Sequence, residues 1–176
     1  DELGVALNVT DRGWKDLLFQ PLMHYQVAPF GFLFLEKVAV TIMGDSEAAF
    51  RFFPYLFSLL SLILFWLVST RYLRTLSMLA ALIVFAMSPT LILYAGTVKQ
   101  YSGDVAVSLF LLYLTLRYFE EPHTLATATA VGIAGGLAIL LSQPAVLVAA
   151  GLGALILIGG RHAGKSYRQL WAICAG

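Results

Sequence analysis

Beyond residue 51, long apolar stretches alternate with short polar segments. Each stretch approaches or reaches the roughly 17–25 residues that a helix needs to cross about 30 Å of hydrocarbon. Charged or turn-forming segments such as "RYLRT", "EEPH" and "SQP" separate the stretches. The pattern predicts five membrane-spanning helices, near Phe52–Thr70, Leu76–Ala95, Val105–Phe119, Leu125–Leu141 and Ala145–Gly159.

Residues 1–47 have a different pattern, with acids, amides and aromatic residues mixed together. The apolar stretch "APFGFLFLEKVAVTIMG" is too short to span a membrane and carries Glu36 and Lys37 at its centre. An interfacial helix fits it better. We therefore predict an all-α polytopic membrane protein with three parts: an extracytoplasmic loop with an interfacial helix (1–47), a five-helix transmembrane region (48–160), and a cytoplasmic loop with the start of a further helix (161–176).

The composition agrees with a membrane protein. The chain is 60% hydrophobic and 12% charged, and its mean hydropathy is +0.84, far outside the usual range of soluble domains. Basic residues do not cluster with aromatic residues, which argues against nucleic acid as a partner. The single cysteine, Cys174, excludes an intramolecular disulfide.

The basic residues predict which side of the membrane each loop occupies. If the five spans alternate, one side holds the loops that contain Arg71, Arg74, Arg117, Arg161, Lys165 and Arg168. The positive-inside rule makes that side cytoplasmic. The other side then holds residues 1–51, the Lys99–Asp104 loop and the Ser142–Pro144 turn, with eight of the ten acidic residues. The N-terminal segment is therefore expected to be extracytoplasmic.

One motif has the spacing of a phosphate-binding loop but the wrong surroundings. The segment "GGRHAGKS", residues 159–166, fits G-x-x-x-x-G-K-S. A P-loop follows a strand in an α/β sheet, whereas this segment follows a predicted membrane helix. We interpret it as a basic cytoplasmic loop.

Two adjacent carboxylates, Asp1 and Glu2, begin the extracytoplasmic segment. One of them could act as a general base and take a proton from an acceptor hydroxyl. Alternatively, both are solvated acids at a helix N-terminus, where negative charge favours the macrodipole.

A second polar cluster, His24, Tyr25 and Gln26, precedes Pro29. Its amide, imidazole and aromatic groups could hold a sugar, or His24 could be an ordinary loop histidine. No second histidine lies at a zinc-ligand spacing. Arg51, at the start of the first span, could pair with a lipid phosphate or simply reach the membrane interface.

A third polar cluster interrupts "LILYAGTVKQYSGDVAVSLF" between two spans and comprises Lys99, Gln100, Tyr101 and Asp104. Ionisable groups next to membrane helices are costly, so a function is a reasonable hypothesis. Lys99 could neutralise a phosphate, and Tyr101 and Asp104 could bind a sugar or a metal. The alternative is a plain loop in the headgroup zone.

Taken in order, several segments resemble the GT-C membrane glycosyltransferases, especially bacterial proteins similar to protein O-mannosyltransferases and lipid A aminoarabinose transferases. The segments are "DE", "YQVAPFGFLFLEK", "GDSEAAFRFFPYLFSLLSL", "SPTLILYAGTVKQYSGD" and "LAILLSQPA". The resemblance covers nearly the whole chain. It departs at Ala28-Pro29, where many members carry two consecutive prolines.

The resemblance implies an enzyme that transfers a sugar, usually with inversion, from a polyprenyl-phosphate donor to a protein, lipid or glycan acceptor. It implies that Asp1 occupies the catalytic acid position with Glu2 as its companion, and that the Lys99–Asp104 loop lines the same cavity. It also implies a multi-pass protein of the cell membrane, such as the bacterial inner membrane. The family's other segments lie outside this chain, so we expect the chain alone to be inactive.

Cofactors and two other functions stay open at this point. The carboxylates could bind a divalent cation, but no ligand spacing requires one. A transporter or lipid-handling protein would also need a polar cavity, yet transporters place ionisable groups near the midplane and show repeated halves. A non-catalytic membrane subunit would bind the lipid-linked sugar without turning it over.

Overall fold

The computed structural model describes residues 2–120 and 125–162, without the side chains of Leu18, His24, Leu125 and residues 157–162. The regular elements in this part of the chain are all helical, as the sequence predicts. They are α1 (Glu2–Asp11), α2 (Trp14–Phe19), the 3-10 helix η1 (Met23–Tyr25), α3 (Phe30–Met43), α4 (Glu47–Ser69), α5 (Thr75–Ala86), α6 (Pro89–Gly96), α7 (Tyr101–Glu120), α8 (Leu125–Leu141) and α9 (Ala145–His162).

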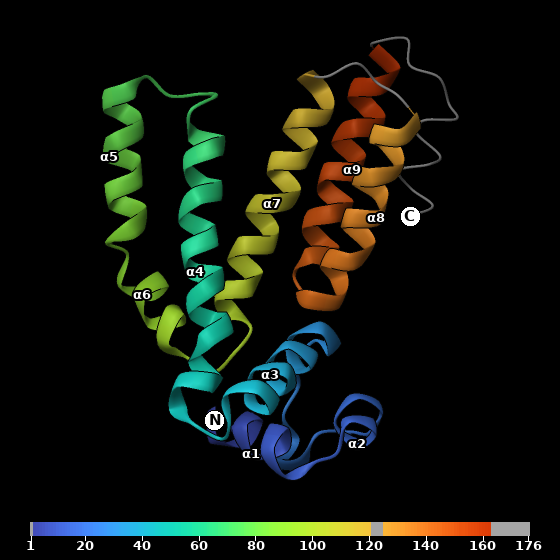
Figure 1. Ribbon diagram of the computed structural model, residues 1–176. Coiled ribbons are helices and arrows are strands. Elements are labelled where there is room, and N and C mark those ends of the chain that lie inside the picture. The colour runs from blue at the N-terminus through green and yellow to red at the C-terminus, as the bar shows by residue number, and fades with distance from the viewer. Residues whose placement is uncertain (1, 121–124, 163–176) are drawn as a thin grey trace.

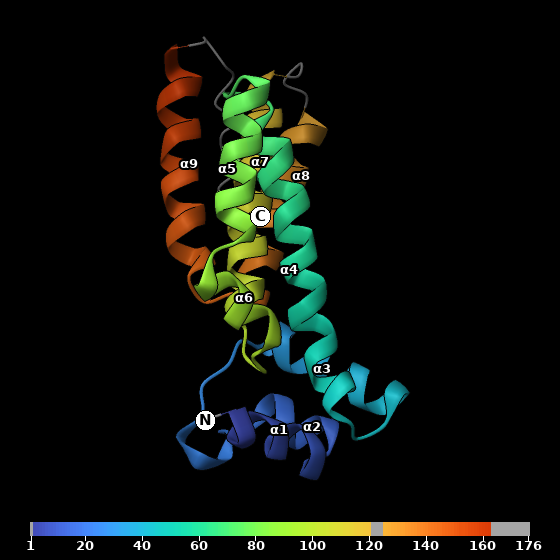
Figure 2. The ribbon, with the colours of Figure 1, turned by 90° about the vertical axis from the view of Figure 1, so that its left-hand side faces the viewer.

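The long helices stand side by side, and α1, α2 and α3 form a layer across one end of them (Figures 1 and 2). We call these three helices the N-terminal layer. Helix α7 packs along α4 and also contacts α8 and α9. Successive long helices run in opposite directions, so the connection from α6 to α7 and the turn from α8 to α9 both lie at the end that carries the N-terminal layer (Figure 1).

Helix α4 has the features of a well-defined long helix. The hydroxyl of Ser46 caps it by accepting a hydrogen bond from the Ala49 backbone N–H at 3.3 Å. By length and composition, α4 is the one helix among the described residues that could cross a membrane. Shorter apolar helices run over Ala126–Leu141 and Ala145–Ile156, so the predicted total of five spans stays a prediction.

The prediction of one continuous helix over Leu76–Ala95 is wrong. The structure has two helices there, α5 and α6, bent by 51° relative to each other. The break comes at Ser88, which precedes Pro89 at the start of α6. A proline disfavours helical geometry in the residue before it and cannot donate a backbone hydrogen bond, so the chain leaves the α5 helix at this point. The bent pair could form a second span if both helices cross together.

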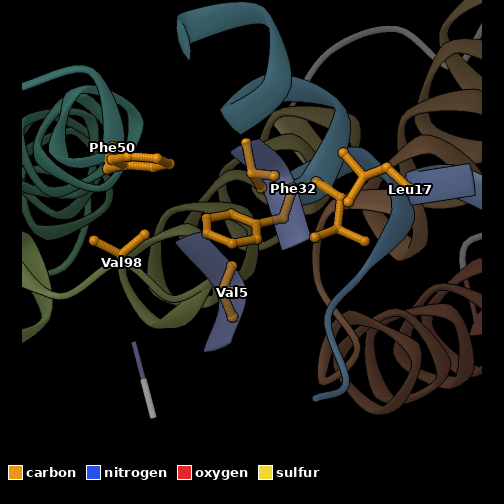
Figure 3. Close-up of a cluster of buried hydrophobic side chains, with 7 residues drawn as sticks. Val5, Leu17, Phe32, Phe50 and Val98 are labelled. Carbon is orange, nitrogen blue, oxygen red and sulfur yellow. The ribbon is translucent and has the colours of Figure 1, made fainter. Parts of the chain in front are cut away.

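An apolar core joins the N-terminal layer to the long helices. We call it the layer core, and in Figure 3 Phe32 lies between Leu17 on one side and Val98 on the other. Side chains from α1, α2, α3, α4 and the α6–α7 connection therefore meet at one place. The core comprises Val5, Val9, Leu17, Phe32, Leu33, Phe50 and Val98.

The outer faces of several long helices remain apolar and exposed. Leu76 and Val84 of α5 are 81% and 73% exposed, and Leu147 of α9 is 79% exposed. Apolar surface of this extent is unusual for a protein surrounded by water. The membrane protein predicted from the sequence would present such a surface to lipid.

Gly31 allows α3 to contact the backbone of α8, and we expect Gly31→Val to destabilise the fold by about 2 kcal/mol through overpacking. A Cβ atom at Gly31 would lie 2.7 Å from the Leu140 carbonyl oxygen, which cannot move independently of the helix. Thermal unfolding in detergent measures the change. Gly135→Val is the control, because a Cβ atom there would have nothing within 4 Å. Equal stability of the two variants would contradict the close approach.

Candidate functional site

The structure brings two of the predicted polar clusters together. The Lys99 ammonium group donates a hydrogen bond to Oε1 of Gln26 at 2.6 Å, across 73 residues of sequence. Lys99 is buried, with 6% of its surface exposed. The contact ties the segment before α3 to the connection between α6 and α7.

The first turn of α1 lies against the same contact. A Cβ atom at Gly4 would lie 3.0 Å from Cγ of Gln26, so the backbone of α1 touches the side chain that Lys99 holds. Glu2 begins α1 two residues earlier and is partly buried. Its companion Asp1 lies outside the described residues. One acid of the predicted pair is thus on the helix end that borders Gln26.

Asn8 fixes the segment that contains Gln26, and sequence reasoning missed this residue. It is fully buried, accepts a hydrogen bond from the Met23 backbone N–H at 2.8 Å, and donates one to the Met23 carbonyl oxygen at 3.2 Å. An asparagine within a short amphipathic helix carries no signal for such a long-range bond. The consequence is that η1 is anchored to α1.

Tyr25, the last residue of η1, has an unusual backbone conformation. Its φ is 53°, and it is the one residue other than glycine with a positive φ in the described part of the chain. This conformation costs most side chains about 1 kcal/mol. The Tyr25 ring is fully exposed. The neighbouring His24 belongs to η1, but its side chain lies outside the described residues.

Arg51 places a second cation beside the end of α6. A Cβ atom at Gly96, the last residue of α6, would lie 3.7 Å from a guanidinium nitrogen of Arg51. Arg51 also pairs with Glu47 at 2.7 Å on an exposed surface of α4, where such a pair contributes little stability. Its guanidinium therefore lies close to the α6–α7 connection.

The remaining predicted residues belong to the first turn of α7 and its approach. The Tyr101 ring packs against the Tyr94 ring at 4.8 Å. Oε1 of Gln100 is buried without a hydrogen-bond partner among the described residues. Asp104 lies beside the hydroxyl of Ser142, which belongs to the α8–α9 turn. Tyr101 therefore packs toward α6, whereas Asp104 faces the α8–α9 turn.

A groove adjoins this part of the site. It has a volume of about 240 Å³ and lies among α4, α5, α6 and α7. Leu91, Ile92 and Val105 make much of its wall apolar, while Tyr94 and Ser102 add hydroxyl groups. Within the described residues, no group of three or more His, Cys, Asp or Glu side chains could hold a metal ion.

The comparisons with known proteins agree with the family resemblance seen in the sequence. A family model of dolichyl-phosphate-mannose-protein mannosyltransferases matches residues 27–175. Comparisons with curated proteins and with solved structures gave no match. The matched residues include Lys99, Arg51 and Asp104, whereas Gln26 and the residues of α1 and η1 precede them. The match confirms the resemblance to GT-C glycosyltransferases. The chain belongs to the dolichyl-phosphate-mannose-protein mannosyltransferase family.

Proposed function

We propose that this chain forms the donor-binding region of a glycosyltransferase that takes a sugar from a polyprenyl-phosphate carrier. Family membership supports a mannosyltransferase-like activity. The single observation that supports the proposal is the Lys99–Gln26 contact, because the side chain that binds this buried cation also lies against Gly4 in the first turn of α1. Transfer from a lipid-linked sugar needs a cation for the departing phosphate and a carboxylate for the acceptor's proton.

The charges suit a direct displacement at the sugar. The acceptor oxygen attacks the anomeric carbon as the bond from that carbon to the phosphate oxygen breaks, which inverts the configuration. Asp1 or Glu2 takes the acceptor proton as a general base. Lys99 and Arg51 stabilise the negative charge that develops on the departing phosphate. No step in this scheme needs a metal ion.

The groove is suited to bind the lipid part of the donor. Its apolar wall can accept part of a prenyl chain, and it lies next to Tyr94, which packs on Tyr101 in the proposed sugar site. A phosphate held near Lys99 and Arg51 would then mark the boundary between lipid and sugar. A soluble nucleotide sugar would leave this apolar surface unused.

The arrangement of the helices supports an extracytoplasmic site. The N-terminal layer and the α6–α7 connection share one end of the bundle (Figure 1). The connection from α4 to α5 lies at the other end (Figure 1). It contains Arg71, which pairs with Glu120 and stacks over the Tyr113 ring at 5.1 Å. By the positive-inside rule, the end with Arg71 is cytoplasmic and the proposed site faces the exterior.

Tyr25 is the proposed sugar-stacking residue, and we expect Tyr25→Asn to lower transfer about tenfold while keeping the protein folded. Asparagine tolerates the left-handed backbone at φ 53° but has no aromatic face. Steady-state transfer and thermal unfolding measure the two effects. Tyr72→Asn is the control, since Tyr72 is also exposed but belongs to the connection between α4 and α5. Full activity of Tyr25→Asn would remove Tyr25 from the site.

Donor turnover tests the proposed function. The intact protein in liposomes is incubated with radiolabelled polyprenyl-phosphate mannose and, separately, with a labelled nucleotide sugar. We expect the label to be transferred to an acceptor from the lipid-linked donor and not from the nucleotide sugar. Binding of the lipid-linked donor without turnover would identify a non-catalytic subunit, and turnover of the nucleotide sugar would contradict the donor class.

A further inference from the structure

Glu36 is an acidic residue inside an apolar core. It is fully buried, and neither carboxyl oxygen has a hydrogen-bond partner in the described part of the chain. Helical spacing puts it on the face of α3 that carries Phe32 and Leu33 one turn earlier and Val40 one turn later. Those three side chains all pack in or against the layer core. A charged carboxylate in these surroundings would have no compensation.

The burial changes the protonation of Glu36. It raises the pKa of this carboxyl group from 4.5 to about 8, because the charged form loses its hydration. Glu36 is therefore neutral at pH 7 when the layer is packed. Once the layer opens and water reaches the side chain, the ordinary pKa returns and the carboxyl group ionises.

The charged groups on the elements around α3, unlike Glu36, either have a hydrogen-bond partner or are at least partly exposed. Lys37, the next residue, donates a hydrogen bond to the Val9 carbonyl oxygen of α1 at 2.6 Å, and Lys99 bonds Gln26. The described part of α8 carries no charged residue. On α1, α2 and α4 the charged side chains are exposed or, for Glu2, partly buried: Glu2, Asp11, Lys15, Asp16, Glu47 and Arg51.

We propose that Glu36 is a proton-controlled latch, which holds the N-terminal layer closed on α4 and the α6–α7 connection while its carboxyl group is neutral. Phe32 and Val98 share the layer core, and Val98 directly precedes Lys99. Opening the layer therefore releases the segment that carries the Lys99–Gln26 contact. The latch is a property of the packing and does not depend on the transfer reaction.

The direction of the pH effect follows from the two pKa values. Below about pH 4.5 the carboxyl group is protonated in both the closed and the open layer, so the latch is strongest. Between about 4.5 and about 8 only the open layer releases the proton, and each pH unit favours opening about tenfold. Above about pH 8 both forms are ionised and the effect levels off.

Hydrogen exchange of the α1 and α3 amides tests the latch in the intact protein. Each variant is compared with the wild type at the same pH, which removes the intrinsic pH dependence of exchange. Relative to Glu36→Gln, opening of the wild-type layer should increase about a hundredfold between about pH 5.5 and about pH 7.5. Glu47→Gln is the matched control, because Glu47 is an exposed glutamate on α4 and should keep the wild-type response.

Glu36→Met is the second variant, in case the buried amide prevents folding, because its flexible apolar chain suits an apolar core. The proposal predicts that both Glu36 variants lose the pH response of the layer. A wild-type response in either folded variant would overturn it. A layer that is loosened at every pH in both variants would also overturn it, since the carboxyl group would then have a structural partner that it needs.

Discussion

We expect that replacing Asp1 by Asn and Glu2 by Gln together abolishes sugar transfer in the intact protein and leaves its insertion in the membrane unchanged. The amides keep the shape of both side chains but cannot accept the acceptor's proton, and loss of a general base costs about 10²–10⁴-fold in rate. Glu2 begins the helix whose Gly4 touches Gln26, so an acid at this end borders the residue that holds Lys99.

Transfer from a radiolabelled polyprenyl-phosphate sugar measures the effect, and the two single variants show which acid acts. Asp11→Asn is the control, because Asp11 is an exposed acid at the other end of the same helix. Transfer at the wild-type rate by the double variant would contradict the role of both acids. It would leave the proposed donor class intact.

We expect Lys99→Met to lower both donor binding and turnover, with a loss in turnover of about 10²–10³-fold. Methionine keeps most of the length of the lysine side chain but removes the positive charge that is proposed to stabilise the departing phosphate. The Lys99 side chain is 6% exposed, so bulk ions cannot readily replace its charge. Binding of a labelled donor and single-turnover transfer separate the two effects.

Lys15→Met is the matched control, since Lys15 is an exposed lysine on α2 and should keep full activity. Gln26→Ala separates charge from position, because it removes the hydrogen-bond acceptor and leaves the cation. We expect a smaller loss in that variant than in Lys99→Met. Donor binding that is unchanged in Lys99→Met would show that the phosphate lies elsewhere.

The positions of the long helices could be predicted from hydropathy, but the way they bend and pack against one another could not. The sequence predicts a helix at Leu125–Leu141, which is where α8 lies. Hydropathy does not show the break before Pro89, because most residues on both sides of Ser88 are apolar. Apolar composition indicates burial in lipid but does not indicate where a helix bends.

The polar residues of the site show a similar limit. Lys99 and Gln26 were each predicted from their local surroundings, but their contact joins positions 73 residues apart. Glu36 looked like a charge that keeps α3 out of the membrane. Its spacing from Phe32 and Val40 places it on the buried face, and this helical spacing is visible in the sequence.

The close approach at Gly31 also has a consequence for synthesis of the chain. The α3 backbone rests against Leu140, more than a hundred residues later in the sequence. A ribosome makes α3 long before α8 exists, so α3 cannot reach its final position when it first emerges. The N-terminal layer therefore stays partly assembled until α8 and α9 have been synthesised and have packed against it.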